Sequence, residues 1–175
     1  MRILFVCTGN ICRSPVAERY ARFWADTHNA KIDSSSVGTH ALVGHPIDEL
    51  AAQALRELGG DPSDFEAKQL TPQLAAEADL ILTMQQFHRD RVLAAAPTAM
   101  LRTFMLSEAA IIVEETEART VKDMALARMR VPHARNSPGV ADPFDQSIDT
   151  HRDIAAEIAT KIATVLSALV SQAKL

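Results

Sequence analysis

The order of strand-like and helix-like segments in this chain predicts the α/β fold class. Four short runs rich in β-forming residues alternate with segments whose apolar residues recur at helical spacing. One run, ADLILTM at residues 78–84, is almost entirely apolar, as expected for a strand buried on both faces of a parallel sheet. The alternation therefore predicts a single three-layer domain, with a four-stranded parallel sheet flanked by helices on both faces.

Length and composition limit the kind of protein. The chain has 175 residues, 47% of them hydrophobic and 23% charged, which suits one soluble domain over residues 1–175. A net charge of −4 provides no global basic surface, so we expect no nucleic-acid partner and only a local anion site. No apolar run is long enough to insert into a membrane, and the first residues do not resemble a signal peptide. The two cysteines are five residues apart and favour a reducing, cytoplasmic location.

The start of the chain predicts a strand, a tight loop and a helix. Residues 2–6, RILFV, form a buried strand, and residues 7–13 contain a glycine and an asparagine that tolerate positive φ. Ser14 suits the N-cap of the following helix, and Pro15 suits its first position. Glu18 is expected near the first turn, where the helix dipole favours a carboxylate.

The middle of the chain is divided by glycine and proline signals. A glycine pair after residue 58 and a proline at residue 97 each end a segment of helical periodicity. The predicted elements are a strand at 31–39, a helix at 47–58, a strand at 78–84, a helix at 86–95 and a strand at 101–106.

The last third of the chain predicts two helices joined by a loop. Residues 107–130 are expected to be helical, with Glu115 and Arg119 as an i,i+4 pair. Residues 130–147 contain three prolines and one glycine and predict a loop. Residues 148–172 carry an apolar stripe and predict a long final helix.

The stretch VCTGNICRSP, residues 6–15, carries the chemistry. Cys7 and Arg13 form a C-x5-R motif between the first strand and the first helix. Backbone N–H groups of a tight loop and the helix N-terminus bind anions, and the guanidinium of Arg13 can hold two phosphoryl oxygens. The same field favours the thiolate of Cys7, which would attack phosphorus and form a cysteinyl-phosphate. The alternative is a buried cysteine in a structural turn and a surface arginine.

A leaving group needs a proton, and a carboxylic acid near the loop would supply it. We favour Asp142 in GVADPFDQS, because Pro143 makes the adjacent backbone rigid and Phe144 offers an aromatic wall. Asp145 and Asp149 are alternatives, and all three aspartates also suit turn or capping positions.

These motifs resemble the low-molecular-weight protein-tyrosine phosphatases of bacterial type. VCTGNICRSP resembles the phosphate-binding loop of that family, and DPF resembles its general-acid motif. SVGT at residues 36–39 and ADLILTM with the following His88 resemble internal landmarks, so the resemblance extends over nearly the whole chain. It implies the sheet order 2-1-3-4 and metal-free hydrolysis of phosphotyrosine without a cofactor.

The resemblance implies a role for individual residues. Cys7 would be the nucleophile, Arg13 the phosphate clamp and transition-state stabiliser, and Asp142 the general acid and then the base. Substrate binding would fall to the remaining loop residues and the pocket wall: Thr8, Gly9, Asn10, Ile11, Cys12, Ser14, Leu42 and Phe144.

Supporting roles are implied in the same way. Asn10 would shape the loop through side-chain hydrogen bonds, Ser14 would donate to the Cys7 thiolate, and Ser36 would support Asn10. Cys12 matches a second loop cysteine that forms a reversible disulfide with the nucleophile and so protects it from irreversible oxidation. Simple packing is the alternative reading of Cys12.

The sequence departs from the family pattern at three places. Phe65 stands where some members have a histidine, so we expect the hydrogen-bond network of the loop to end in an apolar contact. His40, Ala41 and Leu42 lack the usual pocket aromatic, which leaves Phe144 and weakens stacking on an aryl group. A segment within residues 107–140 exceeds the family core. It is expected to be an added helix, either near the loop of the general acid or, as the simpler interpretation, solvated on the surface.

Partners and alternative functions follow from the same residues. The expected partner is a phosphotyrosine protein, with a cognate bacterial tyrosine kinase of polysaccharide export as one candidate. A non-catalytic phosphate or phosphopeptide binder is one alternative. An arsenate reductase is another, which would need an external thiol because no cysteine follows Cys12. His88 is expected to be a structural hydrogen-bonding residue, and no group of residues has the spacing of metal ligands.

Overall fold

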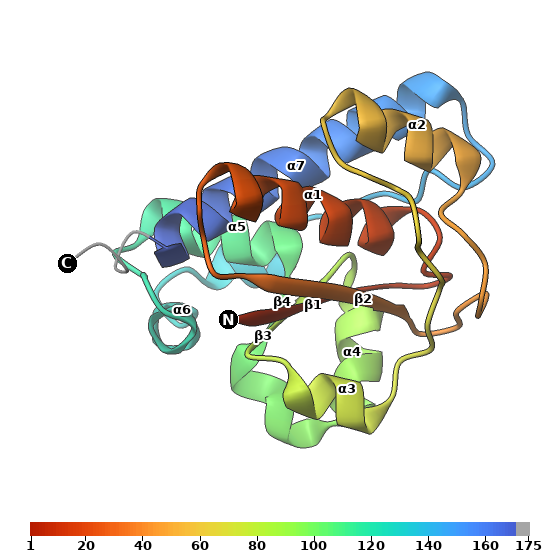
Figure 1. Ribbon diagram of the computed structural model, residues 1–175. Helices are drawn as coiled ribbons and strands as arrows, with labels where there is room; N and C mark the ends of the chain where they lie inside the picture. Colours follow the sequence, from red (N-terminus) through yellow and green to blue (C-terminus); the bar gives the residue numbers. More distant parts are fainter. Residues whose placement is uncertain (171–175) are drawn as a thin grey trace.

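The computed structural model describes residues 1–170, which contain a four-stranded parallel sheet (Figure 1). The strands are β1 (Arg2–Cys7), β2 (Asp33–Gly38), β3 (Leu80–Thr83) and β4 (Thr103–Met105). Their spatial order is β2-β1-β3-β4, which confirms the predicted order. β1 and β2 end side by side, because Cys7 pairs with Gly38. The carboxyl ends of the strands therefore meet at one edge, where sites of open α/β sheets form.

Helices cover both faces of the sheet (Figure 1). One layer contains α1 (Arg13–Thr27), α2 (Glu49–Glu57), α5 (Leu106–Glu115) and α7 (Ile148–Val170). The other contains α3 (Pro72–Glu77), α4 (Gln86–Ala95) and the 3-10 helix η1 (Pro97–Arg102). α6 (Val121–Ala127) packs against α5 and η1, and the 3-10 helix η2 (Pro132–Asn136) packs against α5. Residues 171 and 172 of the last predicted helix lie outside the described residues.

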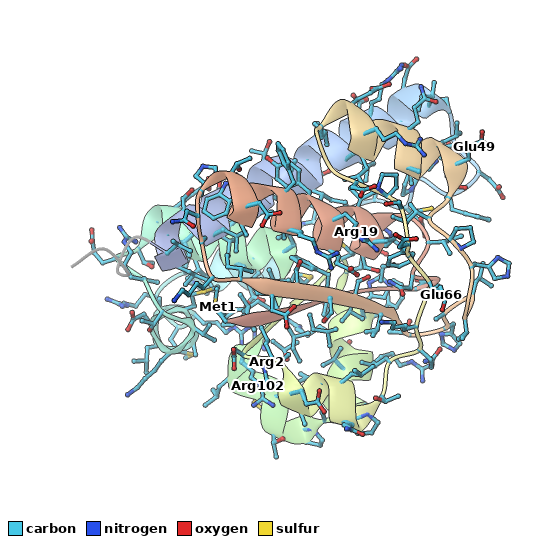
Figure 2. The ribbon with its side chains drawn as sticks, in the orientation of Figure 1. Met1, Arg2, Arg19, Glu49, Glu66 and Arg102 are labelled. Carbon is cyan, nitrogen blue, oxygen red and sulfur yellow. The ribbon has the colours of Figure 1, made fainter. Side chains whose placement is uncertain are left out.

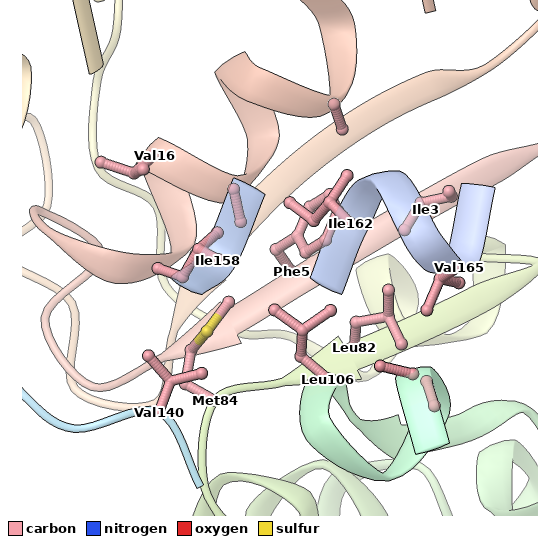
Figure 3. Close-up of a cluster of buried hydrophobic side chains, with 14 of the residues drawn as sticks. Ile3, Phe5, Val16, Leu82, Met84, Leu106, Val140, Ile158, Ile162 and Val165 are labelled. Carbon is pink, nitrogen blue, oxygen red and sulfur yellow. The ribbon is translucent and has the colours of Figure 1, made fainter. Parts of the chain in front are cut away.

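The larger hydrophobic core lies between the sheet and the layer of α1, α5 and α7. Phe5 and Leu82 project from the sheet toward Ile158 and Ile162 of α7, and Leu106 of α5 fills the space beside them (Figure 3). Full burial of a side chain of this size contributes about 1.5–3 kcal/mol. These contacts fix the first strand, and with it the position of the loop that follows.

A smaller core lies on the opposite face. Leu4 and Val6 alternate in β1 with the residues of the larger core and pack with Ile81 of β3. Val92 of α4 and Ala99 of η1 close this side. Because β1 is buried on both faces, its sequence is a continuous apolar run rather than an alternating one.

Charged residues lie mainly on the outside (Figure 2). Met1 and Arg2 are at the end of the sheet where the strands begin, whereas Glu66 lies toward the end where β2 finishes (Figure 2). Among the described residues, no helix combines the length and the apolar character needed to cross a membrane.

The first helix begins differently from the prediction. α1 starts at Arg13, its N-cap is Cys12, and no side chain caps it. Ser14 is therefore not the N-cap, because its hydroxyl is turned toward β1 and contacts the Cys7 thiol instead. Glu18 lies in the second turn and is buried, so it does not serve the helix dipole.

The predicted helix over residues 107–130 is two helices. α5 ends at Glu115, and Thr120 starts α6 by accepting a hydrogen bond from the backbone N–H of Asp123. Glu115 bonds the imidazole of His133 and does not pair with Arg119. The expectation of a solvated surface helix is wrong for α5, because most of its residues are buried in the larger core.

Two other local predictions need correction. α3 was not predicted, although Thr71 caps it and Pro72 occupies its first turn, both of which are helix-start signals. β4 begins at Thr103 and not at residue 101, because the preceding residues form η1 after the proline.

A buried ion cluster closes the β4 edge. The carboxylate of Glu108 is completely buried and lies 2.8 Å from Nε of Arg128 and 3.6 Å from Nη1 of Arg89. Arg128 also donates from Nη2 to the carbonyl of Thr103 at 2.7 Å and stacks on the ring of Phe104. An edge strand leaves carbonyls unpaired, and this arginine satisfies one of them.

Candidate active site

A pocket of about 230 Å³ opens at the carboxyl ends of β1 and β2. Its floor is the loop between β1 and α1, and its walls come from the loop after β2 and the loop before α7. Nearly every residue expected to contact substrate from the sequence lies here. The lining residues are Cys7, Thr8, Gly9, Ile11, Cys12, Arg13, His40, Leu42, Asp142 and Phe144.

Asn10 gives the loop its shape from beneath. Its backbone has a φ of 55°, in the left-handed region that asparagine tolerates better than most residues. The side chain is fully buried and makes three hydrogen bonds. Nδ2 donates to Ser14 Oγ and to Ser36 Oγ, both at 2.8 Å, and Oδ1 accepts from the backbone N–H of Lys68 at 2.7 Å. Asn10 therefore ties the loop to β2 and to the segment before α3.

The Cys7 thiol faces the hydroxyl of Ser14. Ser14 Oγ lies 2.9 Å from Cys7 Sγ, accepts a hydrogen bond from Asn10 Nδ2 and lies 3.4 Å from the carbonyl oxygen of Val37. Once Cys7 is a thiolate it can only accept, so the Ser14 hydroxyl is then placed to donate to Sγ. The first turn of α1 also brings its positive end to the loop. Both features stabilise negative charge on sulfur. Asn10 and Ser14 thus lie behind the pocket wall and do not line it.

The network under the loop continues further than expected. Ser36 Oγ accepts from Asn10 and donates to Glu18 Oε2 at 2.7 Å. The network therefore ends in a carboxylate, and the expectation that it ends at Phe65 is wrong. Phe65 instead packs under the guanidinium of Arg19, 5.6 Å from the ring centroid. Burial raises the pKa of Glu18, while Ser36 and the neighbouring arginines oppose that rise.

Arg13 reaches across the pocket mouth to the opposite wall. Its side chain is only 2% exposed. Nη1 donates to Gln85 Oε1 at 2.9 Å and to the carbonyl of Val140 at 3.1 Å, and Nη2 donates to Asp142 Oδ2 at 2.6 Å. The guanidinium therefore joins the loop after β1, the start of α4 and the loop before α7.

Asp142 is the aspartate of its segment that lies in the pocket. Its side chain is 48% exposed, and Oδ1 accepts from the backbone N–H of Phe144. Phe144 is 49% exposed and forms part of the pocket wall. The two alternatives are placed elsewhere. Asp149 pairs with Arg152 on the surface of α7, and Asp145 occupies a turn with a φ of 59° outside the lining residues.

Cys12 lines the pocket floor and is a free, buried thiol like Cys7. Burial is the main cause of the raised pKa of Cys12, and the carboxylate of Asp48 adds to it. Its thiol is therefore protonated and far less nucleophilic than a thiolate. This environment suits both packing and a resolving role toward an oxidised Cys7.

Sequence reasoning missed one polar contact and gave another no role in the site. Gln85 was not considered, yet it accepts from Arg13. His88 bonds Thr8 Oγ1 at 2.9 Å through Nε2, which agrees with its expected structural role but places it against the loop. The three-residue spacing of Gln85 and His88 at a predicted helix start was the sequence signal that could have drawn attention to these two residues. His40 lines the pocket, and Ser36 lies beneath the loop.

The arrangement can hold a small dianion and attack it. A thiol with a hydroxyl donor, a guanidinium and a carboxyl group meet at one pocket. In the part of the chain that the structure describes, no group of three or more His, Cys, Asp or Glu side chains could hold a metal ion.

Comparisons of sequence agree with this geometry. A family model described as low molecular weight phosphotyrosine protein phosphatase matches residues 2–124. The low molecular weight protein-tyrosine-phosphatase Etp of Escherichia coli strain K12 is 38% identical over 106 residues, which are 61% of this chain and 69% of that protein. The family match contains Cys7 and Arg13 but ends before Asp142, so the position of Asp142 depends on the tertiary structure.

Comparisons of structure extend further along the chain. The low molecular weight protein tyrosine phosphatase of T. tengcongensis has a TM-score of 0.79 and 27% identity, covering 95% of this chain and 98% of its own. The arginine phosphatase YwlE has a TM-score of 0.80 and 25% identity, covering 98% of this chain and 97% of its own. That YwlE structure carries serine in place of cysteine in the active site, and the serine is phosphorylated.

Proposed function

This chain belongs to the low-molecular-weight phosphotyrosine protein phosphatase family, a family of cysteine-dependent enzymes, and we propose that it hydrolyses phosphotyrosine through a cysteinyl-phosphate. The observation that carries the proposal is the convergence of Cys7, Arg13 and Asp142 on one pocket. Each supplies one requirement of phosphate-ester hydrolysis: a nucleophile, a clamp for the phosphoryl oxygens and a proton donor.

The first step transfers the phosphoryl group to sulfur. The phosphate dianion competes with the Asp142 carboxylate for the guanidinium of Arg13, and its second charge and three oxygens favour the exchange. Cys7 Sγ then donates an electron pair to phosphorus, and the bond from phosphorus to the tyrosyl oxygen breaks. Asp142, released from Arg13, takes up a proton from solvent and gives it to the departing phenolate. The phosphorylated serine in YwlE supports a phosphoenzyme at this position.

The second step returns the enzyme to its initial state. Asp142, now a carboxylate, accepts a proton from a water molecule as the water oxygen attacks phosphorus. The sulfur–phosphorus bond breaks, the electron pair returns to Cys7, and inorganic phosphate leaves. The Ser14 hydroxyl lies 2.9 Å from Sγ and can donate its proton to the returning thiolate, which only accepts.

The pocket wall favours an aryl ester over phosphoarginine. Ile11, Leu42 and Phe144 surround the mouth with apolar and aromatic surface. A tyrosyl ring gains from this contact, whereas a guanidinium would lose hydrogen bonds to water on the apolar side of the mouth and, among the lining residues, would find a carboxylate acceptor only at Asp142. Arginine phosphatase activity is the second candidate, because YwlE has the same fold over 98% of this chain.

Three finer proposals concern the setting of the reaction. We infer a cytoplasmic location from the two free thiols. A phosphorylated bacterial tyrosine kinase is our candidate partner. Cys12 serves as a resolving thiol, which forms a disulfide with oxidised Cys7 and releases water. A non-catalytic binder has no use for a proton donor facing the nucleophile, and an arsenate reductase would depend on an external thiol.

The test is hydrolysis of p-nitrophenyl phosphate, a phosphotyrosine peptide and a phosphoarginine peptide, with EDTA and a reductant present. We expect turnover of both aryl esters, none with Cys7→Ser, and a phosphoenzyme of one added phosphate in rapidly quenched Asp142→Asn. Preferential turnover of phosphoarginine would move the assignment to the second candidate. Absence of turnover by folded, reduced protein that still binds vanadate would refute the enzymatic proposal.

A further inference from the structure

His88 approaches the phosphate-binding loop from the face of the sheet opposite α1. It is fully buried at the start of α4, which lies in the layer with α3 (Figure 1). Nε2 is 2.9 Å from Thr8 Oγ1, and Nδ1 is 3.1 Å from the backbone nitrogen of Gln85. The network of Asn10 supports the loop from the other side. The loop is therefore held from both faces.

The contacts of His88 fix the position of its proton. The backbone N–H of Gln85 is a donor, so Nδ1 must accept. Burial first, and then the charge of Arg13, lowers the pKa of His88 to about 3, so the ring is neutral at neutral pH. The single ring proton is then on Nε2, which donates to Thr8 Oγ1. The hydroxyl of Thr8 acts as acceptor in this bond and keeps its own proton for another partner.

The start of α4 is held rigidly enough to act as a support. Gln85 and His88 bond each other at the helix start: the backbone N–H of Gln85 donates to Nδ1 of His88, and the backbone N–H of His88 donates to the carbonyl oxygen of Gln85. Gln85 also accepts from Arg13, and the ring of Phe87 lies 4.0 Å from that of His88. One helix start thus contacts the residue that follows the nucleophile and the residue that clamps the phosphate.

We propose that His88 is a positioning residue for the phosphatase reaction, which holds Thr8 so that its hydroxyl donates to a phosphoryl oxygen. Thr8 lines the pocket directly after Cys7. Within residues 1–170, the Thr8 hydroxyl bonds the imidazole of His88, and the acceptor for the hydroxyl proton would come from the bound phosphate. The inference rests on the proposed function for the nature of the bound group.

A double-mutant cycle tests this arrangement. Thr8→Val removes the hydroxyl with little change in shape. His88→Asn places an amide oxygen near the position of Nδ1, where it accepts from Gln85, but its shorter side chain does not reach Thr8. The measured quantities are kcat and KM for p-nitrophenyl phosphate, and the affinity for inorganic phosphate from protection of Cys7 against iodoacetamide. His133→Asn is the matched control, because His133 is exposed and, among the described residues, its imidazole bonds Glu115 outside the pocket lining.

We expect each single variant to lower phosphate affinity and kcat about five- to tenfold, the loss of one hydrogen bond. The double variant should lose no more than either single one, because both remove the same interaction. Thr8→Ser and His88→Gln, whose longer amide can donate to Thr8, should retain most of the affinity. His133→Asn should match the parent protein.

Two results would overturn the inference. If His88 is purely structural, Thr8→Val should leave the phosphate affinity unchanged, or the losses of affinity in the two single variants should multiply in the double variant. If His88→Asn does not fold, the difference between Thr8→Val and Thr8→Ser decides alone, and equal affinities reject the proposal. A protein that binds phosphate without turnover would refute the proposed function, while the phosphate-affinity cycle still decides the role of His88.

Discussion

Replacement of Asn10 should cost stability and activity in separable amounts. Asn10→Ala removes three buried hydrogen bonds, each worth about 1 kcal/mol. Alanine also lacks the polar side chain that lets asparagine tolerate a φ of 55°, and this loss costs up to about 1 kcal/mol. The lost hydrogen bonds and the backbone strain both destabilise the folded state, so we expect the free energy of unfolding to fall by about 4 kcal/mol.

Two further substitutions separate the contributions at this position. Asn10→Gly removes the side chain without the backbone strain, so it should be about 1 kcal/mol less damaging than Asn10→Ala. Asn10→Asp keeps the acceptor for the backbone of Lys68 but replaces the amide donor with an acceptor. The hydroxyl of Ser14 would then turn its proton away from Cys7, so activity should fall more than stability does.

The assay is urea unfolding followed by the fluorescence of Trp24, the single tryptophan, together with p-nitrophenyl phosphate turnover. A loss below about 1 kcal/mol for Asn10→Ala would refute the reasoning, because it would equal one hydrogen bond at most. A glycine variant less stable than the alanine variant would refute the strain argument. Full activity in Asn10→Asp would show that the Ser14 proton is not directed by Asn10.

Three other outcomes follow from buried groups. Glu108→Gln should lower the free energy of unfolding by about 3 kcal/mol in urea titration, because two arginines lose their buried counter-charge. The control Glu117→Gln, at an exposed site, should leave the free energy of unfolding unchanged, and equal effects of the two substitutions would contradict this. Iodoacetamide at pH 7 should label Cys7 before Cys12, because burial raises the pKa of Cys12, and peptide mass spectrometry showing the reverse order would reject this. The pKa of Glu18 is raised above its ordinary value of 4.5, so the protonated side chain favours the folded state. The free energy of unfolding of the parent protein, compared with that of Glu18→Gln, should therefore decline as pH rises above 4.5. A difference between the two proteins that does not change with pH would contradict the raised pKa.

The sequence was most informative where a local pattern and a tertiary requirement coincided. The apolar run of β1 and the C-x5-R spacing predicted a strand, a loop and a helix in the correct order, because each depends on neighbouring residues. The helix over 86–95 was predicted with its observed bounds, since Pro97 follows it closely. The sheet order 2-1-3-4 came from family resemblance, because local patterns carry no information about which strands are adjacent.

Local propensity was misleading where a side chain had a distant partner. Ser14 is a strong N-cap residue, but its hydroxyl bonds Cys7 and Asn10 instead of the helix amides. Glu18 suits the first turn of a helix, but it lies in the second turn and accepts a hydrogen bond from the hydroxyl of Ser36 in β2. In both cases a buried hydrogen bond between elements outweighed a capping preference of about 1 kcal/mol.

By itself the sequence determined the fold class, the nucleophile candidate and its clamp, because Cys7 and Arg13 are neighbours on one short loop. The tertiary structure alone decided which aspartate meets them and what holds the loop. Asp142 is 129 residues from Arg13 in sequence and 2.6 Å from it in space. Glu18 supports the site from α1 through Ser36, and Gln85 and His88 contact it from the start of α4. Such contacts arise only when packed helices bring distant polar groups together. The three-residue spacing of Gln85 and His88 indicates a helix start, but it does not reveal which loop that helix start contacts.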